Sequence, residues 1–288
     1  MHRSIFAATV AVAALVGAAA LPPGKAEASV FTLQDLNSTM TVDTAGGGVV
    51  SWLVNGVEHM FEQWFWIRID DTMYSDREHR LSGFDRSFEN VSDTNANPGN
   101  DVLNVVYDVG GLLDVSVKLS LEGTNCCGSD LGEQVTIRNA TERALSFSFF
   151  QYTDFDLAGT TTDRIAMIEN TPIGNIIMQE SLLTPSGFWR ATTSIIPDPA
   201  HWEIAFFPDT LVKLGDAFPT TLTDTTSPLG PGDLTWAMQW NVTLQPDQSF
   251  QISKDKLLTP IIPLPASALL LLTGLAGLGA LRRRRPAA

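Results

Sequence analysis

Hydrophobic and polar residues alternate in steps of two along much of the chain between residues 29 and 260. From residue 103 to 109 every second side chain is apolar, and the same alternation returns from 115 to 121. Between the two runs lies Gly110-Gly111, a pair that accepts the positive φ values of a tight hairpin turn. This pattern predicts two antiparallel strands joined by a short turn, each with one buried face.

Two further pairs of runs show the same alternation. One pair spans residues 134–139 and 144–152, and the other spans 235–244 and 249–253 with a turn at Pro246-Asp247. No stretch of helical period exceeds two turns between residues 29 and 260. Many short antiparallel strands separated by Gly, Pro, Asn and Asp favour an all-β fold, and we expect a single antiparallel β-sandwich domain over residues 29–260.

The N-terminus has the three parts of a secretory signal peptide. A short basic start at Arg3 precedes an apolar run from Ile5 to about residue 21, and Ala26-Glu27-Ala28 forms an A-x-A cleavage site. The alternative is an uncleaved transmembrane helix, which the Ala, Val and Gly content of the run disfavours. We predict a signal peptide over residues 1–28.

The C-terminus predicts a membrane span. Residues 266–281 carry no charge and contain seven leucines, and four arginines follow at 282–285. The run is close to the short limit of about 17–25 residues for a transmembrane helix. Positive flanks stay in the cytoplasm, so the domain in front of the span is expected outside it.

A short proline motif precedes the span, and the three parts together resemble a known sorting signal. The motif consists of Pro263, Leu264, Pro265 and Ala266, and the arginines are Arg282, Arg283, Arg284 and Arg285. Residues 261–285 thus resemble the PEP-CTERM family, in its VPLPA variant with Ile262 in place of Val. The resemblance implies a Gram-negative bacterium, processing by an exosortase-type membrane protease, and an association with extracellular polysaccharide. The alternative is a plain tail anchor.

Removing both ends makes the acidity of the domain stronger. The full chain has a formal net charge of −14, but the ends contain six of the 18 basic residues and one of the 32 acidic residues. Residues 29–260 therefore carry a formal charge of −19. A domain of this charge repels nucleic acid and anionic lipid surfaces.

The only two cysteines, Cys126 and Cys127, are adjacent. In an oxidising compartment they are expected to form a vicinal disulfide, which needs unusual backbone geometry, although free thiols or a link between two chains stay open. The Thr, Asn, Gly and Ser residues around them place the pair in a turn.

Two binding sites are candidates on residue chemistry. Asp93, Asn95, Asn97 and Asp101 place oxygen side chains in one loop, which suits calcium, although Pro98 and Asn104 exclude an EF-hand and an ordinary Asx-turn loop is the alternative. Trp64 and Trp66 share one face of a strand and could stack on sugar rings, although aromatic residues on strands more often fill a core.

Catalysis is the weaker expectation. Asp154 and Asp156 would point the same way on a strand, as paired carboxylates in a glycosidase must, but 31 acidic residues make close pairs common by chance. We therefore expect no catalytic residues and no enzymatic activity. The expected function is a non-catalytic, exported cell-surface or extracellular-matrix protein. The alternative is a carbohydrate-active enzyme of the cell envelope, either a glycoside hydrolase or a lyase.

Overall fold

A computed structural model describes residues 29–171, 174–184, 187–225 and 229–261. The predicted signal peptide, proline motif, membrane span and arginine cluster lie outside these residues. Within the described part of the chain, no helix has the length and apolar character needed to cross a membrane.

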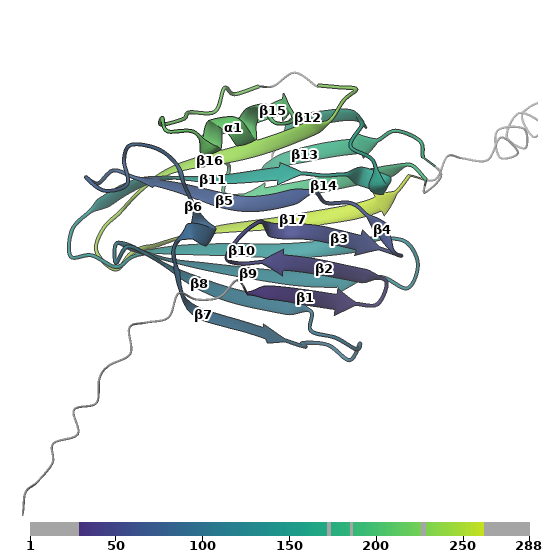
Figure 1. Ribbon diagram of the computed structural model, residues 1–288, viewed down its shortest axis with the longest axis horizontal. Helices are drawn as coiled ribbons and strands as arrows, with labels where there is room; N and C mark the ends of the chain where they lie inside the picture. Colours follow the sequence, from purple (N-terminus) through teal and green to yellow (C-terminus); the bar gives the residue numbers. More distant parts are fainter. Residues whose placement is uncertain (1–28, 172–173, 185–186, 226–228, 262–288) are drawn as a thin grey trace, which may run out of the picture.

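Two stacked antiparallel sheets form the described domain (Figure 1), which confirms the predicted all-β sandwich. Sheet A contains, in spatial order, β1 (Val30–Asp35), β2 (Ser38–Asp43), β3 (Gly48–Val54), β5 (Glu62–Ile69), β11 (Leu145–Asp154), β16 (Leu234–Leu244) and β15 (His201–Phe206). Two short strands extend it, since β4 (Val57–Glu58) pairs with β3 and β6 (His79–Arg80) pairs with β5.

Sheet B contains, in spatial order, β12 (Asp163–Thr171), β13 (Gly174–Ser181), β14 (Trp189–Ile196), β17 (Ser249–Pro260), β10 (Ser129–Asn139), β9 (Leu113–Gly123), β8 (Val102–Val109) and β7 (Asp85–Ser92). The described helices are short: η1 (Leu81–Gly83), η2 (Leu157–Gly159) and α1 (Asp209–Gly215). The last strand in the chain, β17, lies in the middle of sheet B.

The hairpin predicted around Gly110-Gly111 is confirmed. Strands β8 and β9 pair from Val102↔Ser120 to Val109↔Leu113, and both glycines have positive φ. The alternating apolar side chains of β8 are fully buried between the sheets, as the period-two pattern requires.

The other two predicted hairpins are wrong in their pairing. Strand β10 pairs with β9 and β17 in sheet B, whereas β11 pairs with β5 and β16 in sheet A. The chain therefore crosses between the sheets at residues 140–144, and again between β16 and β17. Alternation predicts each strand, but the choice of neighbour depends on contacts far along the chain.

A charged group lies inside the sandwich. Glu133 of β10 bonds to Lys254 and Lys256 of β17, and all three side chains are fully buried. Gln63 of sheet A donates to Glu133 at 2.5 Å, and Lys254 donates to Gln151 of sheet A. These bonds link the facing surfaces of the two sheets through polar rather than apolar contacts.

Candidate active site

The predicted glycan-stacking pair is buried. Trp64 has no exposed surface and packs against Phe65 and Tyr107, while Trp66 is 3% exposed. The guanidinium of Arg80 covers the ring of Trp66 at 4.9 Å. Neither indole can stack on a sugar in this structure, so the prediction is wrong for both residues, and core packing explains them.

The predicted calcium loop is closed by its own hydrogen bonds. The side-chain amides of Asn95 and Asn97 donate to Asp35, and Asn95 also donates to Asp101 at 2.6 Å. Asp93 accepts from the backbone N–H of Asn95, as in an Asx turn. The structure thus brings three of the four residues together around a carboxylate that the sequence did not suggest, and calcium binding here stays a prediction.

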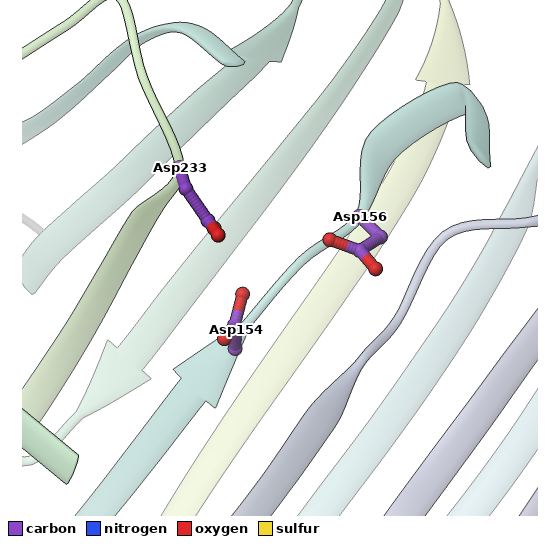
Figure 2. Close-up of side chains that lie close together, drawn as sticks. All are labelled: Asp154, Asp156 and Asp233. Atoms are coloured by element: carbon purple, nitrogen blue, oxygen red, sulfur yellow. The ribbon is translucent and has the colours of Figure 1, made fainter. Parts of the chain in front are cut away.

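Three carboxylates meet at the end of β11. Asp154 is the last residue of β11, Asp156 follows it just before η2, and Asp233 directly precedes β16. One oxygen from each of the three lies within 4.8 Å of the others, and Figure 2 shows their side chains converging from two chain segments. They are the one cluster of three or more acidic, His or Cys side chains at this spacing among the described residues.

The direction of Asp154 follows from the alternation of β11. Gln151 points inward to Lys254, so Tyr152 and Asp154 point to the opposite face of sheet A. Residues directly opposite one another in an antiparallel pair share a face, and the partners of Asp154 are Glu62 of β5 and Thr235 of β16. The cluster therefore lies on the face of sheet A that is turned away from sheet B.

Asp154 is buried and incompletely bonded. Its side chain is 2% exposed, and the Tyr152 hydroxyl donates to Oδ2 at 3.1 Å. Its Oδ1 has no hydrogen-bond partner among the described residues. Burying a carboxyl oxygen without a hydrogen-bond partner lowers the stability of the folded state. Packing alone therefore does not explain why an aspartate stands at position 154.

Burial and mutual repulsion raise the pKa values of the cluster. Burial, followed by the charge of Asp233, raises the pKa of Asp154 to about 8, and the same two causes with Glu58 raise the pKa of Asp156 to about 6. Burial also raises the pKa of Asp233. In the part of the chain that the structure describes, no basic side chain contributes to any of these shifts.

The cluster opens into a small pocket with an aromatic rim. The acidic pocket has a volume of about 100 Å³ and is lined by Phe61, Asp154, Asp156, Thr161, Phe207 and Asp233. Phe61 and Phe207 are 49% and 37% exposed, and their rings meet edge to face at 5.8 Å. The volume is below that of a drug-sized ligand site, so it suits a reacting bond rather than a whole sugar chain.

Larger hollows on the described surface hold different arrangements of charge. One, of about 450 Å³, contains Asp130 and Asp255, and burial, followed by the hydrogen bond and charge of Asp255, raises the pKa of Asp130 to about 7. A hollow of about 410 Å³ lies beside Trp66 and α1, where Arg80 bonds to Glu62 and Glu78 bonds to Arg68. Another, of about 360 Å³, is lined by Arg68, Asp70 and polar residues of β11 and β16. The Glu78 carboxylate keeps one oxygen without a hydrogen-bond partner but forms an ion pair with Arg68. The three acids of the pocket have no such basic partner among the described residues.

Three close carboxylates without a basic partner can be neutralised in two ways. A proton on Asp154 removes one charge and makes that group an acid at neutral pH. A divalent cation could instead bind the three oxygens, because calcium and magnesium prefer carboxylate ligands. The aromatic rim indicates a ligand that offers an apolar ring face next to the acids.

Part of this site could be predicted from the sequence. The spacing of Asp154 and Asp156 placed them on one side of a strand, but chance pairing was the favoured interpretation. Asp233 was missed, because it lies outside the strand pattern that contains Asp154. Nothing in the sequence pointed to Phe61 and Phe207, which are brought together from segments almost 150 residues apart.

Comparison with known proteins shows the fold alone. No family model and no curated protein matches the chain. A bacterial glucoamylase complexed with acarbose has a TM-score of 0.55 at 10% identity, and the match covers 89% of this chain and 36% of the glucoamylase. A putative aldose 1-epimerase from Escherichia coli K12 has a TM-score of 0.49 at 11% identity, covering 81% of this chain and 99% of that one.

This likeness contradicts the predicted non-catalytic role. We expected a surface or matrix protein without enzymatic activity, but the sandwich has the fold of part of an enzyme, the bacterial glucoamylase. The chain spans about a third of the glucoamylase, and the low identity transfers no residue roles. The fold therefore supports the alternative interpretation without defining a reaction.

Proposed function

We propose that this protein is a carbohydrate-active enzyme that hydrolyses a glycosidic bond at the acidic pocket. The observation that carries the proposal is Asp154, a buried carboxyl with an unpartnered oxygen beside a second carboxyl of lower pKa. Glycoside hydrolysis needs this combination, because one carboxyl donates a proton while the other acts as a carboxylate.

In this scheme, the protonated carboxyl of Asp154 donates its proton to the glycosidic oxygen as the bond to the leaving sugar breaks. The carboxylate of Asp156 attacks the anomeric carbon and forms a glycosyl ester, which water then hydrolyses with Asp154 as the base. The cluster oxygens lie within 4.8 Å, closer than the roughly 6.5–9.5 Å between the two carboxyl groups of an inverting enzyme. The spacing thus supports retention of configuration.

The aromatic rim supports a sugar as the ligand. Phe61 and Phe207 are partly exposed and line the pocket beside the acids, and sugar rings present apolar C–H faces to such side chains. The negative pocket disfavours a uronic acid at the cleaved position, because its carboxylate would add another buried charge. Of the two alternative activities, hydrolysis is therefore favoured over lyase chemistry on an acidic polymer.

The experiment compares the full chain with two variants on a panel of neutral, amino and uronic-acid polysaccharides. The Asp154→Asn variant removes the proton donor and is expected to lower the rate of chain shortening by about a hundredfold or more. Asp247→Asn is the matched control, because its side chain is 86% exposed and it follows the last residue of β16, whereas Asp233 of the pocket precedes the first. Equal rates for the wild type and Asp154→Asn would exclude Asp154 as the acid.

A second experiment distinguishes acid–base catalysis by a protonated Asp154 from catalysis that depends on a bound cation. Because the proposed chemistry uses a protonated Asp154, hydrolysis is expected to continue in EDTA, and added calcium is expected to inhibit it by occupying the carboxylates. Hydrolysis that stops in EDTA and returns with calcium would replace the acid–base scheme with a metal-dependent one.

We also propose that the enzyme works outside the cytoplasm. The signal peptide pattern at residues 1–28 and the PEP-CTERM-like tail support export, an exosortase-type partner and delivery to the cell surface or medium of a Gram-negative bacterium. An extracellular polysaccharide of the same organism is then the natural substrate.

A further inference from the structure

The two cysteines form a disulfide between neighbouring residues in the β9–β10 turn. Cys126 and Cys127 are bonded, with Cys126 exposed and Cys127 half-buried. A disulfide stabilises a fold in proportion to the loop that it closes, and this one encloses no intervening chain. Its effect must therefore be local, on the shape of the turn.

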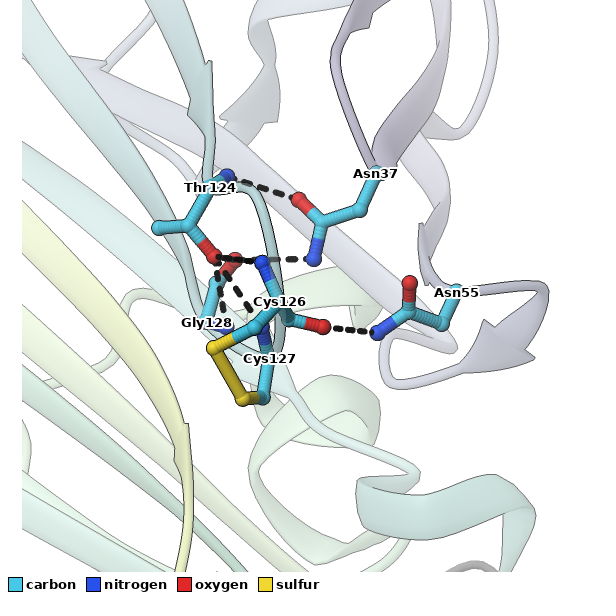
Figure 3. Close-up of a disulfide and its surroundings, with 6 residues drawn as sticks. All are labelled: Asn37, Asn55, Thr124, Cys126, Cys127 and Gly128. Atoms are coloured by element: carbon cyan, nitrogen blue, oxygen red, sulfur yellow. Dashed lines mark hydrogen bonds between the residues drawn. A yellow bond between two sulfur atoms is a disulfide. The ribbon is translucent and has the colours of Figure 1, made fainter.

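The turn is attached to sheet A by side-chain bonds that Figure 3 shows. The amide of Asn37, in the β1–β2 turn, accepts from the Thr124 N–H at 2.7 Å and donates to the Gly128 carbonyl at 3.2 Å. Within the turn, the Thr124 hydroxyl accepts from the N–H groups of Cys127 and Gly128 at 3.1 and 3.0 Å. The disulfide thus lies where turns of both sheets meet.

The disulfide itself carries one of these attachments. The side-chain amide of Asn55, in the β3–β4 turn, donates to the Cys126 carbonyl at 2.7 Å. Bonding the two cysteines fixes the peptide between them and hence the direction of this carbonyl. Asn55 and Gly56 both have positive φ, as in a two-residue hairpin turn, and the Asn55 N–H donates to the Asn37 carbonyl at 2.8 Å.

Five residues lie between Asn55 and Phe61, which lines the acidic pocket. The intervening segment is anchored by Glu58, which accepts from the N–H of Trp52 at 2.7 Å, and by His59, whose Nδ1 accepts from the N–H of Ala158 in η2. It ends at Phe61, whose N–H donates to the Asp154 carbonyl at 3.0 Å. Residues 55–61, which we name the connecting segment, therefore join the disulfide to one wall of the pocket.

We propose that Cys126–Cys127 is a redox-reversible modification site, reduced by a small dithiol, whose state controls the mobility of the connecting segment. A thiolate of the dithiol attacks the sulfur of the exposed Cys126, which breaks the Cys126–Cys127 bond, releases the Cys127 thiolate and forms a mixed disulfide. The second thiolate of the dithiol then attacks its own sulfur in the mixed disulfide, so that the Cys126 thiolate is expelled and the dithiol departs as a cyclic disulfide. The protein gains two electrons and two protons as two thiols. The released turn no longer fixes the Cys126 carbonyl, so Asn55 loses its bond.

The test measures hydrogen exchange of the full chain before and after treatment with dithiothreitol, with alkylation and intact mass to count thiols. Reduction is expected to expose two thiols and to accelerate exchange of the amides in the connecting segment by about fivefold to tenfold, the effect of losing one hydrogen bond. Amides in the centres of β9 and β10 are expected to keep their rates.

Two variants make the result specific. Asn55→Ala removes the bond while leaving the disulfide, and is expected to give the fast rate in both redox states. The Cys126→Ser, Cys127→Ser double variant is expected to give the fast rate and no response to dithiothreitol. Equal exchange rates of the connecting segment in the oxidised and reduced wild type would overturn the proposal. Failure of dithiothreitol to reduce the disulfide in the folded protein would also overturn it.

The effect on catalysis rests on the proposed function, whereas the exchange measurement does not. If hydrolysis is found, reduction is expected to lower its rate several-fold in the wild type and to leave the double variant unchanged. If no substrate is hydrolysed, thiol count and exchange still decide whether the site is redox-reversible. The two proposals can therefore fail separately.

Discussion

At the residue scale, the described domain keeps several carboxyl groups buried without a basic partner. Asp163 of β12 belongs to this set together with the acids of the pocket, and it has no exposed surface. Burial raises its pKa to about 9, although Gln179 donates to its Oδ2 at 2.8 Å. At neutral pH this group is a neutral acid that donates or accepts, like the proposed proton donor Asp154.

This burial predicts the pH dependence of stability. The folded pKa of Asp163 lies above the unfolded value of 3.8, so its stabilising contribution is complete below about pH 4 and is lost as the pH rises through 9. The free energy of unfolding should fall between pH 5 and 9, and Asp163→Asn should reduce that fall by about 1–3 kcal/mol. Denaturant unfolding of the wild type and the variant at pH 5 and pH 9 measures this change in the free energy of unfolding.

Asp247→Asn is the control for this measurement, because the Asp247 side chain is 86% exposed and lies in the turn between β16 and β17, apart from the buried acids. Its unfolding free energy should follow the wild-type pH profile in parallel. A profile of Asp163→Asn that is also parallel to the wild type would show that Asp163 is ionised in the folded protein, against the raised pKa.

The sequence could place some of these acids but not their environment. The sequence predicted that Asp154 and Asp156 point the same way on a strand, but only Asp154 lies in β11, and Asp156 follows the strand just before η2. Their pKa values depend on burial and on Asp233, which arrives from a loop about 80 residues later. The alternation along a strand does not indicate which loop covers the end of that strand. Asp154 and Asp156 therefore could not be distinguished from two acids that are close by chance.

At the element scale, the interior ions tie β10 and β17 to the facing sheet. Glu133 lies opposite Lys254 in the β10–β17 register, and both bond to side chains of sheet A. Burial lowers the pKa of Lys254 to about 7, opposed by the attraction of Glu133. These bonds select one register for β10 and β17. If either strand slipped by one residue, Glu133 or Lys254 would point outward or lose its partner.

Removing the single acid of this group should be costly. Glu133→Gln leaves two buried lysines without a countercharge and is expected to lower the free energy of unfolding by about 3–5 kcal/mol. Asp114→Asn is the comparison, because it removes the partly exposed partner of Arg138 on the neighbouring strands and should cost less than about 1 kcal/mol. Equal losses in denaturant unfolding would mean that water reaches the interior ions.

The strands themselves were largely predictable, whereas their neighbours were not. Residues 134–139 and 144–152 are both strands, yet they belong to different sheets, because β11 finds its partners in β5 and β16. Lys254 and Lys256 add a second difficulty. As charged residues at alternate positions they suggest an exposed face, and only the partner Glu133 permits them to face inward.

At the scale of the whole molecule, the domain and the two chain ends support different proposals. The fold and the acidic pocket support the proposed hydrolysis, while the patterns at the two ends support the proposed export. The tail resemblance predicts that protein isolated from its native host ends near Pro263, after removal of the apolar run and the arginines. Intact mass measures this directly, and a mass that still includes Arg282 to Arg285 would leave a plain membrane anchor.

The position of β17 has a consequence for how the protein is made. This strand is the last of the domain to be synthesised, yet it joins β14 to β10 in the centre of sheet B. Until it arrives, sheet B consists of two separate halves, and the Glu133 charge has no lysine partner. The export proposed above would be compatible with this order, because the chain cannot complete sheet B before almost all of it has been synthesised.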